Sequence, residues 1–490
     1  MSGMNIMRSC TTYVAHADEP TMTERSAVNS TNDADQTLAL RSDDHPDQNS
    51  ADPQPNIAYP IDTSAEITRL LGRYSKAKKA IPVSFRRLVP WLKVGERATH
   101  YIHPYPAKLL PHIAHFFLAS EKLCPKQGIV LDPFGGSGTV ALEACLAGRV
   151  AAYTDTNPLA RLIAATKVWH PGDTDFEAVF TDLHSRYRKS RATTHPNVIN
   201  ISKWFDPTVI RGLSRLRAAI EAETDHNIKQ FLHTTFSATV RRVSNADLRL
   251  SVPVLRKSRE EIINPNFVWD RFEEQFRSNA RRAIALKSML TSRPEVYVAG
   301  SDARNLTLEL GGNLEDASID LVITSPPYAG AQKYIRASSL SLGWLNLAGQ
   351  GQLKPLENKT IGREHLPRDV VEDGVITSVP AANRVIQRIR KKNPTRAAIC
   401  ATYLNEMEAV FSQISRVLKP SGKLVLVIGN NEVCGEKFLS SNYLSEQLAQ
   451  LGFILSLKMV DEIKSRGLMT KRNKTASVIT REWVLVFEKN

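Results

Sequence analysis

Short apolar runs recur along the chain, and each ends in a polar residue or a glycine. Five of them cover 129–131, 150–154, 296–299, 321–324 and 423–428, and stretches with helical spacing of apolar residues lie between them. This alternation predicts strands of a parallel sheet connected by helices. Two further runs, 453–463 and 477–488, are separated by a basic stretch and predict a terminal antiparallel pair. We expect an α/β domain with a mostly parallel, seven-stranded sheet.

Three segments interrupt this pattern. Residues 1–62 are rich in polar residues and proline, which predicts a disordered tail. Residues 171–294 show helical apolar spacing with abundant Lys and Arg, and predict a helical insertion. Residues 332–398 form a second, basic insertion. The remaining parts, 63–170 and 295–490, are expected to build one domain.

A glycine-rich turn follows the first apolar run and covers Asp132 to Thr139. Glycines let a backbone approach a ligand closely, and the carboxylate of Asp132 could accept hydrogen bonds from a cationic amino group. The second run ends at Asp155, about 20 residues after the turn, which is the spacing at which an acidic residue holds ribose hydroxyls. No Gly-Lys-Ser/Thr or G-x-G-x-x-G sequence is present, which disfavours a nucleoside triphosphate or a dinucleotide.

The run at 321–324 leads into Ser325, Pro326, Pro327 and Tyr328. The prolines restrict the backbone, so the Ser325 hydroxyl and the Pro326 carbonyl would point in preset directions. These two oxygens suit the two hydrogens of a planar amine, and the Tyr328 ring offers a face for stacking. The simpler interpretation is an ordinary strand that ends in a proline turn.

Together the two motifs resemble the amino-group DNA methyltransferases, which use S-adenosylmethionine and have a class I, Rossmann-like fold. The segment from His103 to Lys108 resembles the part of that family that encloses the methionine end of the cofactor, and the turn at Asp302 resembles the one that meets the adenine. The resemblance implies that 63–170 binds the cofactor and that 295–490 is the catalytic part. The implied cofactor-binding residues are His103, Tyr105, Lys108, Asp132, Pro133, Phe134, Gly135, Gly136, Ser137, Gly138, Thr139, Asp155 and Asp302, and the implied catalytic residues are Ser325, Pro326, Pro327 and Tyr328.

The implied reaction moves a methyl group to the exocyclic N4 amine of a cytosine that has been flipped out of double-stranded DNA. In the family, Ser at the first position of the Pro-Pro-Tyr motif is associated with cytosine, but both amines present the same two hydrogens, so N6-adenine stays an alternative. Methylation of an RNA or protein amine, or a relative that binds without turnover, are further alternatives. Methylation of a ring carbon needs a cysteine nucleophile, which the related carbon-methylating enzymes usually present after a proline. It is disfavoured here because the chain has no Pro-Cys dipeptide.

Charge is consistent with a nucleic-acid partner. The chain carries +14, and the nine acidic and three basic residues among 1–60 leave +20 for the remainder. Arg241, Arg242, Lys333 and Arg336 are candidate DNA contacts in the two insertions. The five cysteines have no zinc-ligand spacing, so no metal site is expected. No apolar run is long enough to span a membrane, and we expect a cytoplasmic protein. The resemblance makes a cognate restriction endonuclease one candidate partner, with phage defence and regulation as alternative roles. The oligomeric state does not follow from the sequence.

Overall fold

The computed structural model describes residues 58–490 apart from Pro60, Glu96, Ala107 and the segments 194–195, 259–260, 308–313, 331–332, 350–352, 374–375 and 463–479. The chain divides into Met1–Gln54 and Pro55–Asn490, and all described residues belong to the second unit. The tail predicted for residues 1–62 therefore falls almost entirely outside the described residues, and it stays a prediction.

The described residues build one large sheet of eight strands, in the order β1-β9-β10-β6-β5-β2-β3-β4. Its strands are β1 (Ile81–Val83), β2 (Ile129–Asp132), β3 (Val150–Tyr153), β4 (Val296–Val298), β5 (Ile319–Thr324), β6 (Leu418–Ile428), β9 (Phe453–Glu462) and β10 (Arg481–Lys489). Strand β10 runs antiparallel to β9 and β6, and all other pairings are parallel. The mostly parallel α/β fold and the terminal antiparallel pair are thus confirmed.

The predicted number of seven strands is one too low, because β1 pairs with β9 at the edge of the sheet. This strand has only three residues, and its centre is Pro82. Proline lacks the N–H that a central strand needs, so a run containing it is tolerated only at an edge, and the sequence pattern alone does not reveal it. A separate hairpin joins β7 (Asn431–Val433) to β8 (Glu436–Phe438).

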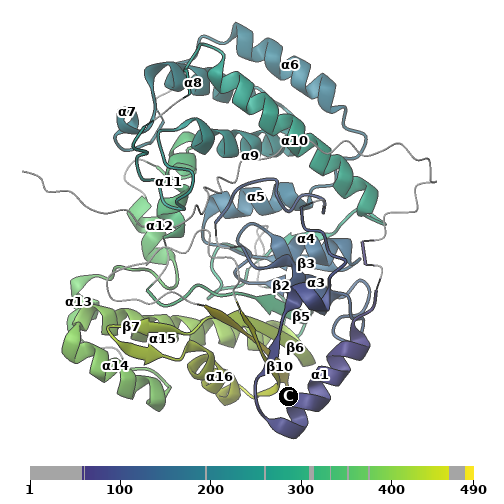
Figure 1. Ribbon diagram of the computed structural model, residues 1–490, viewed down its shortest axis with the longest axis vertical. Helices are drawn as coiled ribbons and strands as arrows, with labels where there is room; N and C mark the ends of the chain where they lie inside the picture. Colours follow the sequence, from purple (N-terminus) through teal and green to yellow (C-terminus); the bar gives the residue numbers. More distant parts are fainter. Residues whose placement is uncertain are drawn as a thin grey trace, which may run out of the picture. The chain divides into compact units, whose positions relative to one another are not determined.

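Helices cover both faces of the sheet (Figure 1). On one face α1 (Ser64–Ala77), α3 (Pro111–Leu118) and α4 (Thr139–Leu146) share a buried cluster with Val130, Leu321 and Ile323. On the other face α14 (Pro380–Lys392), α15 (Pro394–Val417) and α16 (Ser440–Gln450) share a cluster with Leu131 and Val322. Successive strand residues thus point to opposite faces, as the pleat requires. Burial on both faces explains why β2 and β5 are continuous apolar runs.

A third buried cluster lies in the helical insertion, drawn above the sheet in Figure 1. It is built from α6 (Phe176–Lys189), α8 (Pro207–Glu221), α9 (His226–Val243) and α10 (Phe267–Met289), with the short α7 (Ile201–Trp204) beside them. The cluster also contains residues of α5 (Pro158–Val168) and of α11 (Tyr334–Trp344), including the fully buried Trp344. The insertion is therefore packed onto the helices that border the sheet ends.

Three shorter helices complete the fold: α2 (Phe85–Leu88), α12 (Leu353–Lys359) and α13 (Arg368–Asp373). Among the helices of the described residues, none is both long and apolar enough to cross a membrane.

A buried carboxylate ties the segment before β2 to helix α4. Glu143 is fully buried, and Arg97 donates to its two oxygens at 2.7 and 2.8 Å. The rings of His100 and His115 and the hydroxyl of Tyr59 also bond to it, at 2.7, 3.2 and 2.6 Å. Burial opposes ionisation, but the Arg97 guanidinium and these hydrogen bonds hold the pKa of Glu143 well below its usual range. The segment that leads to His103 is thereby anchored to the helix that follows the glycine-rich turn.

Candidate active site

The two sequence motifs meet at the carboxyl ends of adjacent parallel strands. Asp132 is the last residue of β2 and Thr324 the last of β5, and the two strands pair directly. The Thr324 hydroxyl donates a hydrogen bond to Asp132 Oδ1 at 2.7 Å, and the Phe134 N–H donates to the same oxygen at 3.1 Å. The glycine-rich turn and the Pro-Pro-Tyr turn therefore leave the sheet side by side, at the edge where α/β proteins bind ligands.

The glycine-rich turn is tightly constrained. Gly138 has a φ of +77°, and a Cβ there would lie 2.8 Å from the Cβ of Ala164 in α5. The Gly135 N–H donates to the carbonyl of Thr154 at 2.8 Å, and the Gly136 N–H donates to Asp155 Oδ2 at 3.0 Å. The turn is thereby fastened to the end of β3, and only glycine fits at position 138 without strain.

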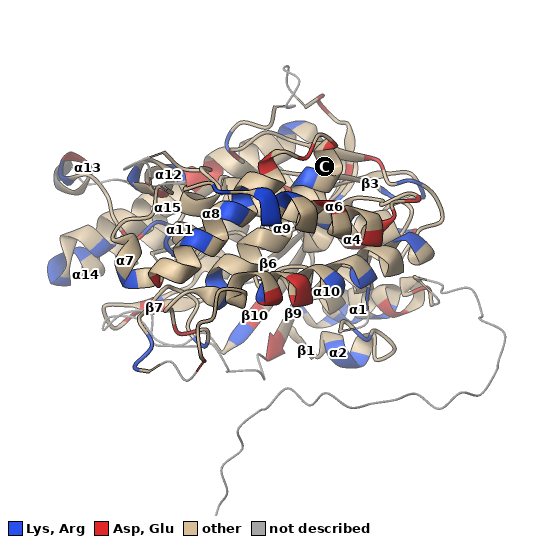
Figure 2. Ribbon diagram, turned by 90° about the horizontal axis from the view of Figure 1, so that it is seen from above, with Lys and Arg blue, Asp and Glu red and all other residues tan. Residues whose placement is uncertain are grey.

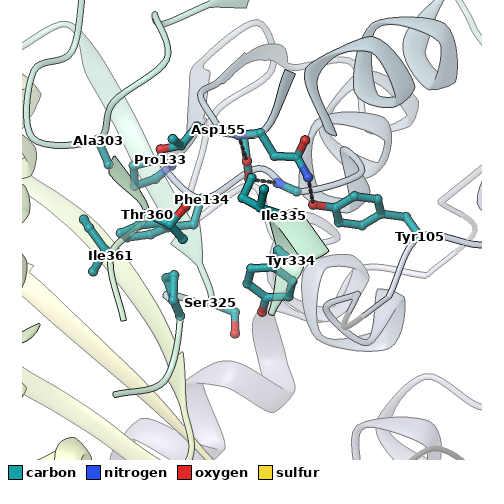
Figure 3. Close-up of a pocket in the computed structure, with 14 residues that line it drawn as sticks. Tyr105, Pro133, Phe134, Asp155, Ala303, Ser325, Tyr334, Ile335, Thr360 and Ile361 are labelled. Atoms are coloured by element: carbon teal, nitrogen blue, oxygen red, sulfur yellow. Dashed lines mark hydrogen bonds between the residues drawn. The ribbon is translucent and has the colours of Figure 1, made fainter. Parts of the chain in front are cut away.

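A pocket opens between these strand ends, and we call it the strand-tip pocket. It contains about 650 Å³ of empty space, part of which is open to solvent. Its lining comes from the turns after β2, β3, β4 and β5, from α11, from the residues that follow α12 and from Tyr105 (Figure 3). The lining residues are Tyr105, Pro133, Phe134, Gly136, Asp155, Thr156, Asn157, Ala303, Ser325, Pro327, Tyr334, Ile335, Thr360 and Ile361.

Two carboxyl groups near this pocket are perturbed. Burial raises the pKa of Asp132 to about 7, although the hydrogen bonds from Thr324 and Phe134 oppose this rise. Burial also raises the pKa of Asp155, whose Oδ1 and Oδ2 accept the N–H groups of Asn157 and Gly136. Both hydrogen bonds to Asp132 end on Oδ1, and among the described residues its Oδ2 accepts none. Asp132, Gly135 and Gly138 do not themselves line the pocket. A cationic group that reached Oδ2 of Asp132 would favour its ionised form.

The segment from His103 to Lys108 is only partly at the pocket. Tyr105 lines it, and its hydroxyl accepts a hydrogen bond from Asn157 Nδ2 at 3.0 Å. His103 does not line it, because its buried ring lies against helix α9, with Nε2 3.0 Å from Ser237 Oγ. Lys108 also lies outside the lining and donates to the carbonyl of His103 at 2.6 Å, while burial lowers its pKa to about 8.

Asp302, Ser137 and Thr139 do not line the strand-tip pocket either. The carboxylate of Asp302 is paired with Arg304 at 2.8 Å, and the neighbouring Ala303 reaches the pocket instead. Ser137 is buried beneath the turn, and Thr139 begins α4 and borders a second cavity.

The Pro-Pro-Tyr turn contributes Ser325 and Pro327 to the pocket, while Pro326 is buried between them. Figure 3 shows Ser325 and Tyr334 on the side of the pocket opposite Asp155. The Tyr328 ring is partly buried against the cluster on the α14–α16 face, and its hydroxyl donates to Glu482 Oε1 at 3.2 Å. The turn is therefore held between β2 and the start of β10.

Seven lining residues were not predicted from the sequence: Thr156, Asn157, Ala303, Tyr334, Ile335, Thr360 and Ile361. Asn157 had a recognisable signal, because it precedes Pro158 and caps α5 by accepting a hydrogen bond from the Leu159 N–H at 3.1 Å. The residues of α11 and those that follow α12 carry no local motif, and only the fold brings them to the pocket.

The four basic residues predicted to contact DNA have different surroundings. Arg241 donates to backbone carbonyls of the loop after α9, including that of Ser251 at 2.8 Å, and Arg242 forms an ion pair with Glu274. Lys333 lies 3.7 Å from Glu364, and Arg336 is exposed on α11. Figure 2 shows further Lys and Arg positions on α2, α8 and α14.

No family model matches the chain. The chain is 25% identical over 355 residues to the type II methyltransferase M.MvaI of Kocuria varians, which covers 68% of this chain and 77% of that protein. It is 22% identical over 468 residues to the type II methyltransferase M.BsoBI of Geobacillus stearothermophilus, which covers 82% of this chain and 88% of that protein.

Two solved structures resemble this chain over most of its length. A SAM-dependent methyltransferase from Methanosarcina mazei matches 78% of this chain and 99% of its own, with 10% identity and a TM-score of 0.29. The rRNA methyltransferase aviRa from Streptomyces viridochromogenes matches 83% of this chain and 96% of its own, with 11% identity and a TM-score of 0.30.

Proposed function

The chain is a homologue of type II methyltransferases, and from this premise we propose that it transfers a methyl group from S-adenosylmethionine to the N4 amine of cytosine in double-stranded DNA. The observation that carries the proposal is the strand-tip pocket. It brings Pro133, Phe134 and Gly136 of the glycine-rich turn together with Asp155 and with Ser325 of the Pro-Pro-Tyr turn. Methyl transfer requires the methyl donor and the acceptor amine to lie side by side, and these are the two loops proposed to hold them.

The pocket has the chemistry that S-adenosylmethionine requires. Asp155 offers oxygens to ribose hydroxyls, and Phe134 and Ile361 offer apolar surface to an adenine ring. Asp132 directly precedes Pro133 of the lining, and in this proposal its Oδ2 accepts the ammonium group, which would compensate for the burial of the carboxyl. When bound, the cofactor supplies an electrophilic methyl group on a sulfonium.

The Pro-Pro-Tyr turn would activate the acceptor amine. The lone pair of an exocyclic amine is delocalised into the base, and acceptors for its two hydrogens favour the geometry in which that pair is localised on nitrogen. In this proposal the Ser325 hydroxyl and the Pro326 carbonyl accept these hydrogens as preorganised oxygens that need no rearrangement during the reaction. The new C–N bond forms as the C–S bond breaks, and the surplus proton on nitrogen leaves to water.

The excess of basic residues supports a DNA substrate, since Lys and Arg attract phosphates. We assign the amine to cytosine because Ser325 occupies the first position of the turn, and modification of N6-adenine is the alternative outcome. A cognate restriction endonuclease is the expected partner of a type II methyltransferase, and the cytoplasm is the expected place of action.

The test is to express the protein in a bacterial host without DNA modification and to sequence its DNA by a method that separates N4-methylcytosine from N6-methyladenine. We expect N4-methylcytosine within one short recurring sequence, and a much smaller modified fraction when Ser325→Ala is expressed at the same level. Unmodified DNA together with methyl groups in RNA would contradict the proposal.

A further inference from the structure

The side chain of Asn157 joins three parts of the protein beside the strand-tip pocket. It is 2% exposed and lines the pocket. Its Oδ1 accepts the Leu159 N–H at 3.1 Å, which caps α5. Its Nδ2 donates to the hydroxyl of Tyr105 at 3.0 Å and to Oγ of Ser338 in α11 at 3.0 Å. One amide therefore connects the start of α5 with Tyr105 and with α11.

Capping α5 does not by itself require an asparagine. Helix α8 begins in the same way, with a polar residue before a proline, and there Asp206 is the cap, accepting the Thr208 N–H at 2.7 Å. Serine, aspartate and asparagine cap helices about equally well, because each offers a side-chain oxygen. Only the amide also provides a nitrogen that donates two hydrogens at the same time. The nitrogen of Asn157 thus serves Tyr105 and Ser338 rather than the helix.

The bond from Asn157 fixes how the Tyr105 hydroxyl is used. A carboxamide nitrogen donates and does not accept, so the Tyr105 oxygen is the acceptor and its own hydrogen remains for another group. Among the residues that the structure describes, none accepts that hydrogen. Tyr105 is 7% exposed and lines the pocket, and Figure 3 shows its hydroxyl end facing the other lining residues. Burial raises the pKa of this hydroxyl well above its usual range, so it stays protonated and can donate.

The Tyr105 hydroxyl lies near the carboxylate of Asp155. Both groups bond to Asn157, whose backbone N–H donates to Asp155 Oδ1 at 2.8 Å. After burial, the charge of Asp155 is the next cause that raises the pKa of Tyr105. A ribose hydroxyl has one hydrogen to donate and lone pairs that accept. Asp155 can accept such a hydrogen and Tyr105 can donate to such an oxygen, so the two groups together complement a ribose diol.

We propose that Asn157 is a positioning residue that turns the Tyr105 hydroxyl so that this hydroxyl donates a hydrogen bond to the ribose of the bound cofactor. The inference rests on the proposed function, because it concerns how the same pocket holds S-adenosylmethionine. It adds a hydrogen-bond donor beside the acceptor Asp155.

The test is a double-mutant cycle in the full-length protein, with the affinity for S-adenosylmethionine measured by calorimetry. Asn157→Ser keeps a capping oxygen for α5 and removes the nitrogen that bonds to Tyr105. Tyr105→Phe removes only the hydroxyl. Ser338→Ala is the matched control, because it removes the other hydrogen bond of the same amide and lies outside the pocket lining. Urea denaturation of each variant checks that it is folded.

We expect Asn157→Ser and Tyr105→Phe each to weaken the affinity by about 3- to 10-fold, the effect of one neutral hydrogen bond. The two substitutions together should weaken it no further than Tyr105→Phe alone, because Asn157 acts through a hydroxyl that is then absent. Ser338→Ala should bind the cofactor within about twofold of wild type.

Effects of the two substitutions that multiply in the double variant would overturn the inference, since they would give Asn157 a purely structural role. An unchanged affinity in either single variant would overturn it too, as would a loss in Ser338→Ala as large as that in Asn157→Ser. If Asn157→Ser did not fold, Tyr105→Phe would decide alone, because unchanged affinity without the hydroxyl contradicts the inference. Wild-type protein that binds no S-adenosylmethionine would instead refute the proposed function.

Discussion

The hydroxyl of Thr324 lies 2.7 Å from Oδ1 of Asp132, so the end of β5 is hydrogen-bonded directly to the end of β2. Replacing Thr324 with Val keeps the shape of the side chain but removes the donor. Because Asp132 is 4% exposed, the loss leaves a buried carboxyl with one partner fewer, which costs roughly 1–3 kcal/mol. We expect the free energy of unfolding, measured by urea denaturation, to fall by that amount.

Thr324→Ser is the matched variant, since it keeps the hydroxyl and loses only a methyl group. Its free energy of unfolding should lie close to that of the wild type, because the hydrogen bond to Asp132 is kept. Equal stability of Thr324→Val and wild type would show that this bond does not join the two strand ends in solution.

Cofactor affinity should depend on pH through Asp132. Burial raises the pKa of this carboxyl to about 7 in the free protein, so below that pH the group is protonated and neutral. An ammonium ion needs the ionised form, and we therefore expect the affinity for S-adenosylmethionine to fall by up to about tenfold per pH unit between pH 7 and 5.5. Calorimetry across this range measures it, with proton release on binding as a second readout.

Asp132→Asn should bind the cofactor weakly at every pH in this range, with a flat profile. If the variant retained the slope of the wild type, another group would be responsible for the pH dependence.

Ser325→Ala should separate catalysis from cofactor binding. The hydroxyl is proposed to accept a hydrogen of the target amine, and removal of one preorganised oxygen lowers kcat by about 10²- to 10³-fold in comparable sites. Affinity for S-adenosylmethionine should change little, because a single hydroxyl of the lining is lost. Single-turnover methyl transfer is the measurement, and a rate within twofold of wild type would exclude this role for Ser325.

Gly138→Ala should be more destabilising than Gly148→Ala. Both glycines have positive φ, +77° and +68°, so each alanine incurs about 1–2 kcal/mol of backbone strain. At Gly138 the new Cβ also meets Ala164 at 2.8 Å, whereas at Gly148 nothing lies within 4 Å. Overpacking adds about 1–3 kcal/mol, so the free energies of unfolding of the two variants should differ by that amount. Equal stabilities would contradict the close approach of α5 to the turn.

Glu143→Gln should strongly destabilise the protein. The substitution leaves the guanidinium of Arg97, whose side chain is 6% exposed, without its carboxylate, and breaking a buried pair costs about 3–5 kcal/mol. The control is Glu66→Gln, which removes the exposed pair with Arg69 and should have no measurable effect. Thermal unfolding compares the two, and a small effect of Glu143→Gln would mean that this cluster does not anchor the segment before β2.

Acid should weaken the same cluster. The pKa of Glu143 is held well below its usual range in the folded protein, so its contribution to stability is present above the unfolded pKa and is lost as pH falls through the folded pKa. Burial lowers the pKa of His100 to about 4 in the folded protein. As the pH falls below about 6.5, the unfolded chain therefore binds a proton at His100 before the folded protein does. Both effects make the wild type less stable in acid.

The amino-acid sequence by itself determined the two turns of the site and the strands that deliver them. The apolar runs at β2, β3, β5 and β6 are buried on both faces, so their composition is locally unmistakable, and the polar or glycine residue after each run marks the strand end. Asp155, the glycines of the turn and Ser325 could be placed at one sheet edge for that reason. The pair Asn157-Pro158 likewise indicates the start of a helix from local sequence alone.

Only the tertiary structure decided what surrounds these turns. Tyr334 reaches the strand-tip pocket from α11 and Ile361 from the turn after α12, and β1 joins the sheet through only three residues with a proline at their centre. Likewise Glu482 meets Tyr328 across 154 positions of the chain because β10 is inserted antiparallel beside β6. Such contacts depend on how distant elements pack, and hydrophobic periodicity reports only the face that each element buries, not the partner that covers it.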